Sequence, residues 1–290
     1  MAIAKGTETK DVSFKNFIGI GNVNVVAVNP TKAELAKIGR SVDDEPQYVT
    51  VKDDGTVTAR ICLYLKPIEN PEELMVINFF IRNSRFVSAS KGTLQVIDSY
   101  GRTAWVTEEQ LAKHEIPVYS NGNPASIATN YRAAFSGEDT FTQFVKAYLN
   151  IPNLTSYVDG QWVPNPKATP ADCEVRFDQI DKWFKGDFKE VKDAFAYQPN
   201  NTVQMLFGVR TDDQNRQYQT YFSDKFYKGL KEVTGTYRAE GFEKELDKIN
   251  SNPATSNRYA NTEFAFCPLK EYAPVATSFE EETVKENPWD

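Results

Sequence analysis

The chain has 290 residues, of which 40% are apolar, 13% aromatic and 25% charged, and its formal net charge is −7. This composition is ordinary for a soluble globular protein, and the length allows one large domain or two ordinary ones. The segment 280–290 holds five carboxylates and one Lys, so it supplies −4 of the charge and leaves the rest of the chain at −3. A nucleic-acid-binding surface on such a body would need its basic residues to cluster on one face.

Cysteine usage and the N-terminal sequence predict a protein of a reducing cytoplasm. The three cysteines, Cys62, Cys173 and Cys267, lie far apart and lack metal-ligand spacing, which argues against a disulfide framework. The first residues contain no long apolar stretch of the kind found in signal peptides. No run approaches the roughly 18 apolar residues of a membrane span.

The first half of the chain is expected to be rich in β-structure. A polar arm over residues 1–16 precedes strand structure over 17–28, and Thr31 and Glu34 form the capping box of a short helix that ends at Gly39. Alternating apolar residues then predict a β-hairpin over 48–65. Further strands are expected over 76–82, 86–89, 93–98 and 102–106.

The second half alternates helices with a hairpin. A capping box over 136–139 predicts a helix with Phe141, Phe144 and Tyr148 on its packed face. The remaining expected elements are a proline-rich linker or long loop over 151–171, an amphipathic helix over 177–195, a hairpin over 202–222, a helix over 242–249 and a strand over 263–269.

These elements predict an α+β fold that is mostly antiparallel β, because the early strands form a meander rather than a βαβ series. We expect an arm over 1–16, one β-rich domain over 17–270 with a possible break at 151–171, and an acidic tail over 271–290.

No catalytic constellation is recognisable. The one histidine, His114, has no second histidine or cysteine pair with which to complete a zinc site. The sequence contains neither a Gly-x-Ser-x-Gly elbow nor a phosphate-binding Gly-x-x-x-x-Gly-Lys-Ser/Thr loop. We therefore expect a protein that is not an enzyme and needs no cofactor. The alternative is a two-metal nuclease site built from scattered carboxylates, because such sites need not be local in sequence.

Aromatic residues interleave with arginine and lysine on several expected strands. Single-stranded nucleic acid is held by this combination, because bases stack on flat side chains while cations follow the phosphates. The competing interpretation is that most of these aromatics belong to the core. Trp105 and Arg102 are the strongest candidates because they lie close together beside the turn at Gly101. The full set of candidate contacts is Arg82, Arg85, Phe86, Tyr100, Arg102, Trp105, Tyr131, Arg132, Arg216, Tyr218, Tyr221 and Lys225.

Four segments, residues 28–35, 97–106, 131–138 and 144–152, resemble proteins of Bacteroides phages of the crAss-like group. The resemblance spans most of residues 17–270, and the family is one of single-stranded DNA-binding proteins of the replication module. It implies an OB-like barrel elaborated with inserted helices and a non-catalytic role in phage DNA replication, recombination or repair. It also implies the host cell cytoplasm as the location.

The C-terminal sequence Phe-Glu-Glu-Glu-Thr-Val-Lys-Glu-Asn-Pro-Trp-Asp predicts a disordered acidic tail, because it cannot bury enough apolar surface to fold alone. Replicative single-strand binders generally carry an acidic tail with a terminal aromatic residue, and this ending is similar in kind, although here an aspartate is last. Such a tail suits two tasks: occupying a basic groove in place of DNA, and offering an aromatic hook to a polymerase, primase or helicase. The candidate partner-binding residues are Phe279, Glu280, Glu281, Glu282, Trp289 and Asp290.

Two other functions stay open on the sequence alone. One is a virion structural or cargo protein whose tail docks on another capsid component, and the other is a metal-dependent DNA-processing enzyme. For the DNA-binding hypothesis we expect neither a membrane partner nor a small-molecule substrate.

Overall fold

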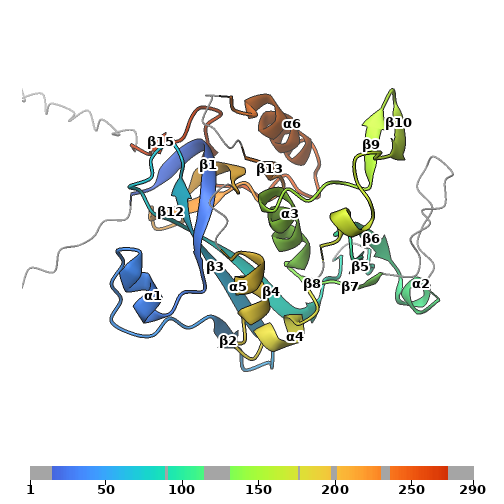
Figure 1. Cartoon of the computed structure of the whole chain (residues 1–290), viewed down its shortest axis with the longest axis horizontal. Coiled ribbons are helices and arrows are strands. Elements are labelled where there is room, and N and C mark those ends of the chain that lie inside the picture. Colours follow the sequence, from blue (N-terminus) through green and yellow to red (C-terminus); the bar gives the residue numbers. More distant parts are fainter. Residues whose placement is uncertain are drawn as a thin grey trace, which may run out of the picture.

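The computed structural model describes residues 15–88, 91–113, 131–175, 177–196, 201–229 and 236–273. Within these residues, one antiparallel sheet of ten strands dominates, and its central path runs β12-β11-β1-β3-β4-β8 (Figure 1). The ten strands are β1 (Phe17–Val28), β2 (Val49–Val51), β3 (Val57–Pro67), β4 (Met75–Arg85), β8 (Phe135–Ser136), β11 (Val203–Thr211), β12 (Gln217–Tyr221), β13 (Tyr227–Lys228), β14 (Thr262–Phe264) and β15 (Lys270–Glu271).

Two smaller sheets extend to one side of the large one (Figure 1). The three-stranded sheet consists of β5 (Leu94–Ile97), β6 (Thr103–Val106) and β7 (Arg132–Ala133), and a separate hairpin consists of β9 (Thr155–Val158) and β10 (Gln161–Pro164). The helices are α1 (Lys32–Lys37), α2 (Glu108–Ala112), α3 (Glu138–Tyr148), α4 (Ile180–Trp183), α5 (Lys189–Ala194), α6 (Ala239–Asn250) and the short 3-10 turn Ala171–Cys173.

The large sheet curls into a half-barrel, so that β4 and β12 face each other across the main core. The ring of Tyr221 on β12 lies 5.7 Å from that of Phe79 on β4, and its hydroxyl donates a 3.1 Å hydrogen bond to the main-chain oxygen of Asn78. From α3, Phe144 packs 5.2 Å from Phe79 and 5.4 Å from Phe226. Aromatic side chains therefore fill the concave face of the sheet.

The outer face of the sheet is covered in two places. From α6, Phe242 joins Ile20 and Leu206 of β1 and β11 in a separate buried cluster. From α1, Leu35 packs in a cluster with Tyr64 of β3. The beginning of β3 and the end of β4 instead keep exposed and half-exposed residues on this face.

Several predictions of local structure are confirmed. The antiparallel α+β class and both predicted hairpins are present. Both hydrogen bonds of the capping box at Thr31 and Glu34 form, and Gly39 adopts a φ of +81° just after α1. On α3, the predicted packed face around Phe141 and Tyr148 is buried.

Other local predictions are wrong, and backbone geometry explains two of them. Ser136 does not cap α3, because it lies in β8 and the helix starts after Gly137 in a left-handed conformation. The single helix expected over 177–195 is two helices, because Gly186 at φ +87° interrupts it. The expected loop over 151–171 contains β9 and β10, and residues 86–88 form no strand beyond one bridge at Val87.

Residues 1–14 of the arm predicted over 1–16 lie outside the described residues, as does His114. The same holds for residues 274–290 of the tail predicted over 271–290, including Phe279, Glu280, Glu281, Glu282, Trp289 and Asp290. Among the helices that the structure describes, none combines the length and the apolar character needed to cross a membrane.

Candidate nucleic-acid interface

β3 and β4 present an aromatic and basic surface where none of the described helices covers the outer face of the sheet. On β4, Ile77, Phe79 and Ile81 are buried, whereas the alternating residues Phe80 and Arg82 are exposed. This pattern follows from the pleat of a strand, which sends successive side chains to opposite faces. Phe80 keeps 50% of its surface exposed, which is unusual for a phenylalanine in the middle of a sheet.

Strand register brings Arg60 beside this phenylalanine. Arg60 on β3 is the direct partner of Phe80 on β4, and opposite residues of an antiparallel pair have Cβ atoms about 4.5–5.5 Å apart on one face. The Arg60 guanidinium lies 5.3 Å from the ring centroid of Tyr48 and donates a 2.6 Å hydrogen bond to the main-chain oxygen of Gln47. Arg60 is therefore held in place by neutral groups.

We call Arg60, Phe80 and Arg82 the outer patch. Neither arginine forms an ion pair with any residue that the structure describes, and Phe80 makes no ring contact within the same residues. A guanidinium without a carboxylate partner is free to bind phosphate oxygens with its planar fork of donors. The ring of Phe80 is likewise free to stack on a base.

A second aromatic surface lies on the three-stranded sheet. Trp105 on β6 is 42% exposed, and its ring centroid lies 5.3 Å from that of half-buried Phe86. Arg85, just before Phe86, pairs with Glu108 at 3.4 Å. We call Arg85, Phe86, Arg102 and Trp105 the tryptophan surface: the rings of Phe86 and Trp105 are in contact, Arg85 directly precedes Phe86, and Arg102 stands directly before β6, the strand of Trp105.

Arg102 and Arg216 are both held by the same kind of turn. Asp98 accepts hydrogen bonds from the main-chain N–H and the Nε of Arg102, with an ion pair at 2.7 Å. Asp212 accepts the equivalent bonds from Arg216, again with an ion pair at 2.7 Å. In each turn the guanidinium also lies over a tyrosine ring, at 4.9 Å for Tyr100 and 5.9 Å for the exposed Tyr218.

Two predicted stacking residues are packed against core clusters. Tyr131 is 6% exposed and belongs to the small core of the three-stranded sheet, whereas Tyr221 is half-buried and packs against the main core, where burial raises the pKa of its phenol. The structure therefore offers little support for base stacking on these two rings, because Tyr131 is buried and Tyr221 packs against the main core. Lys225 is half-buried, with its ammonium 5.2 Å from the ring centroid of Tyr227.

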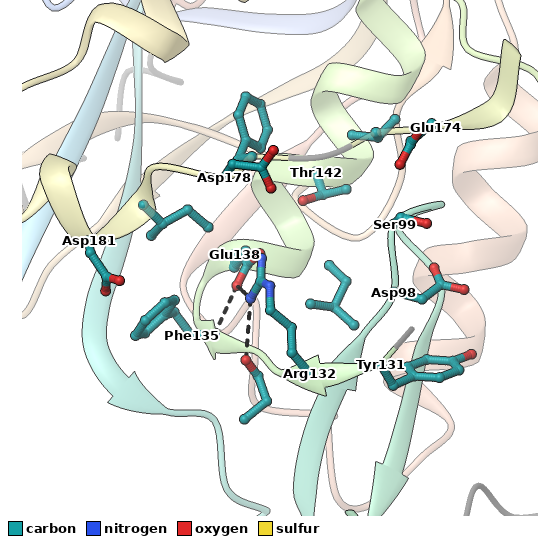
Figure 2. Close-up of a pocket in the computed structure, with 15 residues that line it drawn as sticks. Asp98, Ser99, Tyr131, Arg132, Phe135, Glu138, Thr142, Glu174, Asp178 and Asp181 are labelled. Atoms are coloured by element: carbon teal, nitrogen blue, oxygen red, sulfur yellow. Dashed lines mark hydrogen bonds and ion pairs between the residues drawn. The ribbon is translucent and has the colours of Figure 1, made fainter. Parts of the chain in front are cut away.

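Arg132 lies in a cavity of about 740 Å³ between β7, β8, α3 and α4 (Figure 2). Its guanidinium forms a two-pronged ion pair with the buried carboxylate of Glu138, which also accepts the main-chain N–H of Phe135. Against the lowering effect of burial, Glu138 and the carboxylates of Asp178 and Asp181 raise the pKa of Arg132.

We call this space the acidic cavity, because its lining includes five carboxylates, those of Asp98, Glu138, Glu174, Asp178 and Asp181, for one arginine. Such an excess of negative charge repels phosphate groups. Among the described residues, no group of three or more His, Cys, Asp or Glu is arranged to hold a metal ion.

A second cavity of about 630 Å³ lies between α5, the turn before it and residues 45–49. Its lining includes Tyr48, Phe184 and Phe188 together with three lysines and three carboxylates. We call it the aromatic cavity. Unlike the acidic cavity, it carries no excess of negative charge.

Phe80 and Arg60 were missed as candidates in the sequence. The signal that identifies them is the alternation on β4, where Ile77, Phe79 and Ile81 mark the buried face and leave Phe80 and Arg82 outside. No protein-family model, curated protein or solved structure matches the chain.

Proposed function

We propose that this protein binds single-stranded DNA without catalysis, through the outer patch on β3 and β4. The observation that carries the proposal is the half-exposed ring of Phe80 next to its cross-strand partner Arg60 and to Arg82 two residues further along β4, two arginines that lack ion-pair partners among the described residues. Base stacking on such a ring contributes about 1–3 kcal/mol and accepts any base, while guanidinium groups follow the backbone phosphates. The tryptophan surface provides a second stacking group, the ring of Trp105, but its arginines are paired with carboxylates.

An OB-like barrel is the finer interpretation of the fold that we propose. Its support is the curl of the large sheet and the position of α3, which contacts β4 and β8 near one end of the strand order and β11 and β13 near the other. OB-folds are five-stranded, partly open barrels that bind oligonucleotides on a strand face. The present sheet departs from that pattern, because it has ten strands among the described residues and the order β12-β11-β1-β3-β4-β8.

The biological setting that we propose rests on the sequence resemblance. The protein would coat DNA during phage replication, recombination or repair in the host cell cytoplasm, and its acidic tail would recruit a polymerase, primase or helicase. In this proposal Trp289 is the hook for the partner, and Glu280, Glu281 and Glu282 compete with DNA for the basic surface. Deletion of residues 279–290 should then leave the affinity for DNA equal or higher.

Titration of fluorescent oligo-dT tests the proposal directly. Wild-type protein should bind with micromolar or tighter affinity at low salt, and the logarithm of the binding constant should fall with the logarithm of the salt concentration by about 0.7 per phosphate contacted. The double variant Phe80→Ala, Arg82→Glu should bind far more weakly while keeping its circular dichroism spectrum. Absence of binding to oligo-dT at low salt, or equal binding by this variant, would sink the proposed function.

A further inference from the structure

The aromatic cavity adjoins the outer patch, and we propose that it receives one nucleotide of the same bound DNA strand. The inference rests on the function proposed above and extends it from a stacking surface to a surface with a pocket at one end. DNA bound at the outer patch alone would leave the aromatic cavity empty, and the inference assigns one nucleotide to it as the ligand.

The first argument is a shared wall. Gln47 and Tyr48 line the aromatic cavity, and both also hold Arg60 of the outer patch. The guanidinium of Arg60 lies 5.3 Å from the Tyr48 ring centroid and 2.6 Å from the main-chain oxygen of Gln47. A DNA strand that stacks on Phe80 and follows Arg60 therefore reaches the edge of the cavity.

The second argument is the chemistry of the walls. Tyr48 and Phe188 meet edge to face with ring centroids 6.2 Å apart, and Phe184 packs 5.2 Å from Phe135 beside them. Tyr48, Phe184 and Phe188 all line the cavity. Aromatic walls suit the flat faces of a nucleobase, and enzymes that extrude a base hold it between aromatic and apolar side chains.

The third argument is charge. Lys189 and Lys192 at the cavity are paired with Asp193 and Glu34, whereas the exposed Lys185 forms no ion pair with a described residue. Counting Lys185, the lining holds three lysines against the three carboxylates of Glu45, Asp187 and Asp193, so the cavity has no net negative charge and the ammonium of Lys185 can meet a single phosphodiester group. The acidic cavity on the other side of α4 carries five carboxylates for one arginine and would repel the same group.

The fourth argument is the volume of the cavity and the small free-energy cost of turning one base into it. A volume of about 630 Å³ lies within the range of about 300–1,000 Å³ that is typical of small-ligand sites, so there is room for a base with its sugar. Turning one base out of a single strand is cheap compared with extrusion from a duplex, because no base pair has to be broken.

A length series of dT oligonucleotides tests the inference with two matched variants. Lys185→Glu reverses the charge at the mouth of the cavity, and Lys182→Glu makes the same change at an exposed position of α4 that does not line the cavity. For wild type, the affinity should rise by a step of about fivefold or more at the length that first spans both the outer patch and the cavity. Lys185→Glu should remove that step and leave short oligonucleotides unaffected, whereas Lys182→Glu should keep it.

Photo-crosslinking gives an independent readout. With 5-iodouracil placed at each position of a long oligonucleotide in turn, peptide mapping should find one position that crosslinks to Tyr48, Phe184 or Phe188 and another that crosslinks to Phe80. Crosslinks to Phe80 alone, or identical length profiles for the two lysine variants, would overturn the inference and leave the proposed function standing. Wild-type protein that binds no oligonucleotide of any length would overturn both.

Discussion

The outer patch and the tryptophan surface both combine aromatic residues with arginines, but they differ in whether the arginines have carboxylate partners. In the outer patch, Arg60 and Arg82 have no carboxylate partner among the described residues, whereas the arginines of the tryptophan surface face Glu108 and the buried Asp98. A phosphate that binds the second surface must compete with a carboxylate that is already in place. Under the proposed function, interleaved aromatic and basic residues therefore offer phosphate contacts only where their neighbours in space leave the cations unpaired.

The largest effect that we expect comes from Phe80→Ala. Loss of the exposed ring should weaken binding to oligo-dT by about 1–3 kcal/mol, because one base loses its stacking partner. The free energy of unfolding should change by no more than about 0.5 kcal/mol, since the ring is half-exposed and makes no ring contact with described residues. Fluorescence titration and urea denaturation measure the two quantities.

Phe79→Ala is the matched control for that prediction. Phe79 is 2% exposed and packs on Phe141, Phe144 and Tyr221, so its loss should cost about 3–5 kcal/mol of folding free energy. If Phe80→Ala instead unfolds the protein and retains the DNA affinity of whatever stays folded, the outer patch is structural and the comparison above fails.

The next effect in size is expected for Arg82→Gln. Removal of one unpaired guanidinium should lower the slope of the logarithm of affinity against the logarithm of salt concentration by about 0.7, the value for one phosphate contact on a single strand. Arg216→Gln is the control, because the side chain of Arg216 is also exposed but forms an ion pair with Asp212. Titrations at four or more salt concentrations measure both slopes, and equal slopes for the two variants would contradict the assigned role of unpaired charge.

Much of the fold was predictable because local rules decided it. The capping box at Thr31 and Glu34, the alternation on β3 and β4 and the helical spacing of Phe141, Phe144 and Tyr148 are all local in sequence. What the sequence did not show was the curl of the large sheet. That curl brings Tyr221 of β12 against Phe79 and Asn78 of β4, and a contact between strands so far apart in the chain has no local signature.

The candidate site was predictable in part. Trp105 and Phe86 do lie together. Whether the arginines are free to bind phosphate, however, depends on their carboxylate partners. Two of those carboxylate partners lie close by in the sequence. In Asp98-Ser-Tyr-Gly-Arg102 and in Asp212-Asp-Gln-Asn-Arg216, an aspartate stands four residues before the arginine. In the structure, each aspartate forms an ion pair with its arginine across a turn. The partner of Arg132 is also near in sequence, yet the neighbouring Asp178 and Asp181 come from a distant segment.

A smaller effect is expected for Trp105→Ala. Its ring is exposed by 42% and already touches Phe86 on one side, and the nearby arginines are paired, so we expect a loss of DNA affinity below about 1 kcal/mol. Titration of this variant beside Phe80→Ala ranks the two surfaces. A larger loss for Trp105→Ala than for Phe80→Ala would reverse the ranking and move the main contact to the tryptophan surface.

The smallest effect is a gain. Glu108→Gln removes the carboxylate that faces Arg85, and both side chains of this pair are well exposed. Exposed ion pairs are weak, so freeing Arg85 should raise the affinity for oligo-dT by at most about threefold at low salt, and screening should abolish the gain as ionic strength increases.

Glu109→Gln is the control, because it changes the net charge equally but frees Lys113 instead. A gain for Glu108→Gln that exceeds that of Glu109→Gln, and that disappears when Arg85→Gln is added, would show that an ion pair alone separates the tryptophan surface from the outer patch. Equal gains for both variants would mean that net charge, rather than the pairing of particular arginines, sets the affinity.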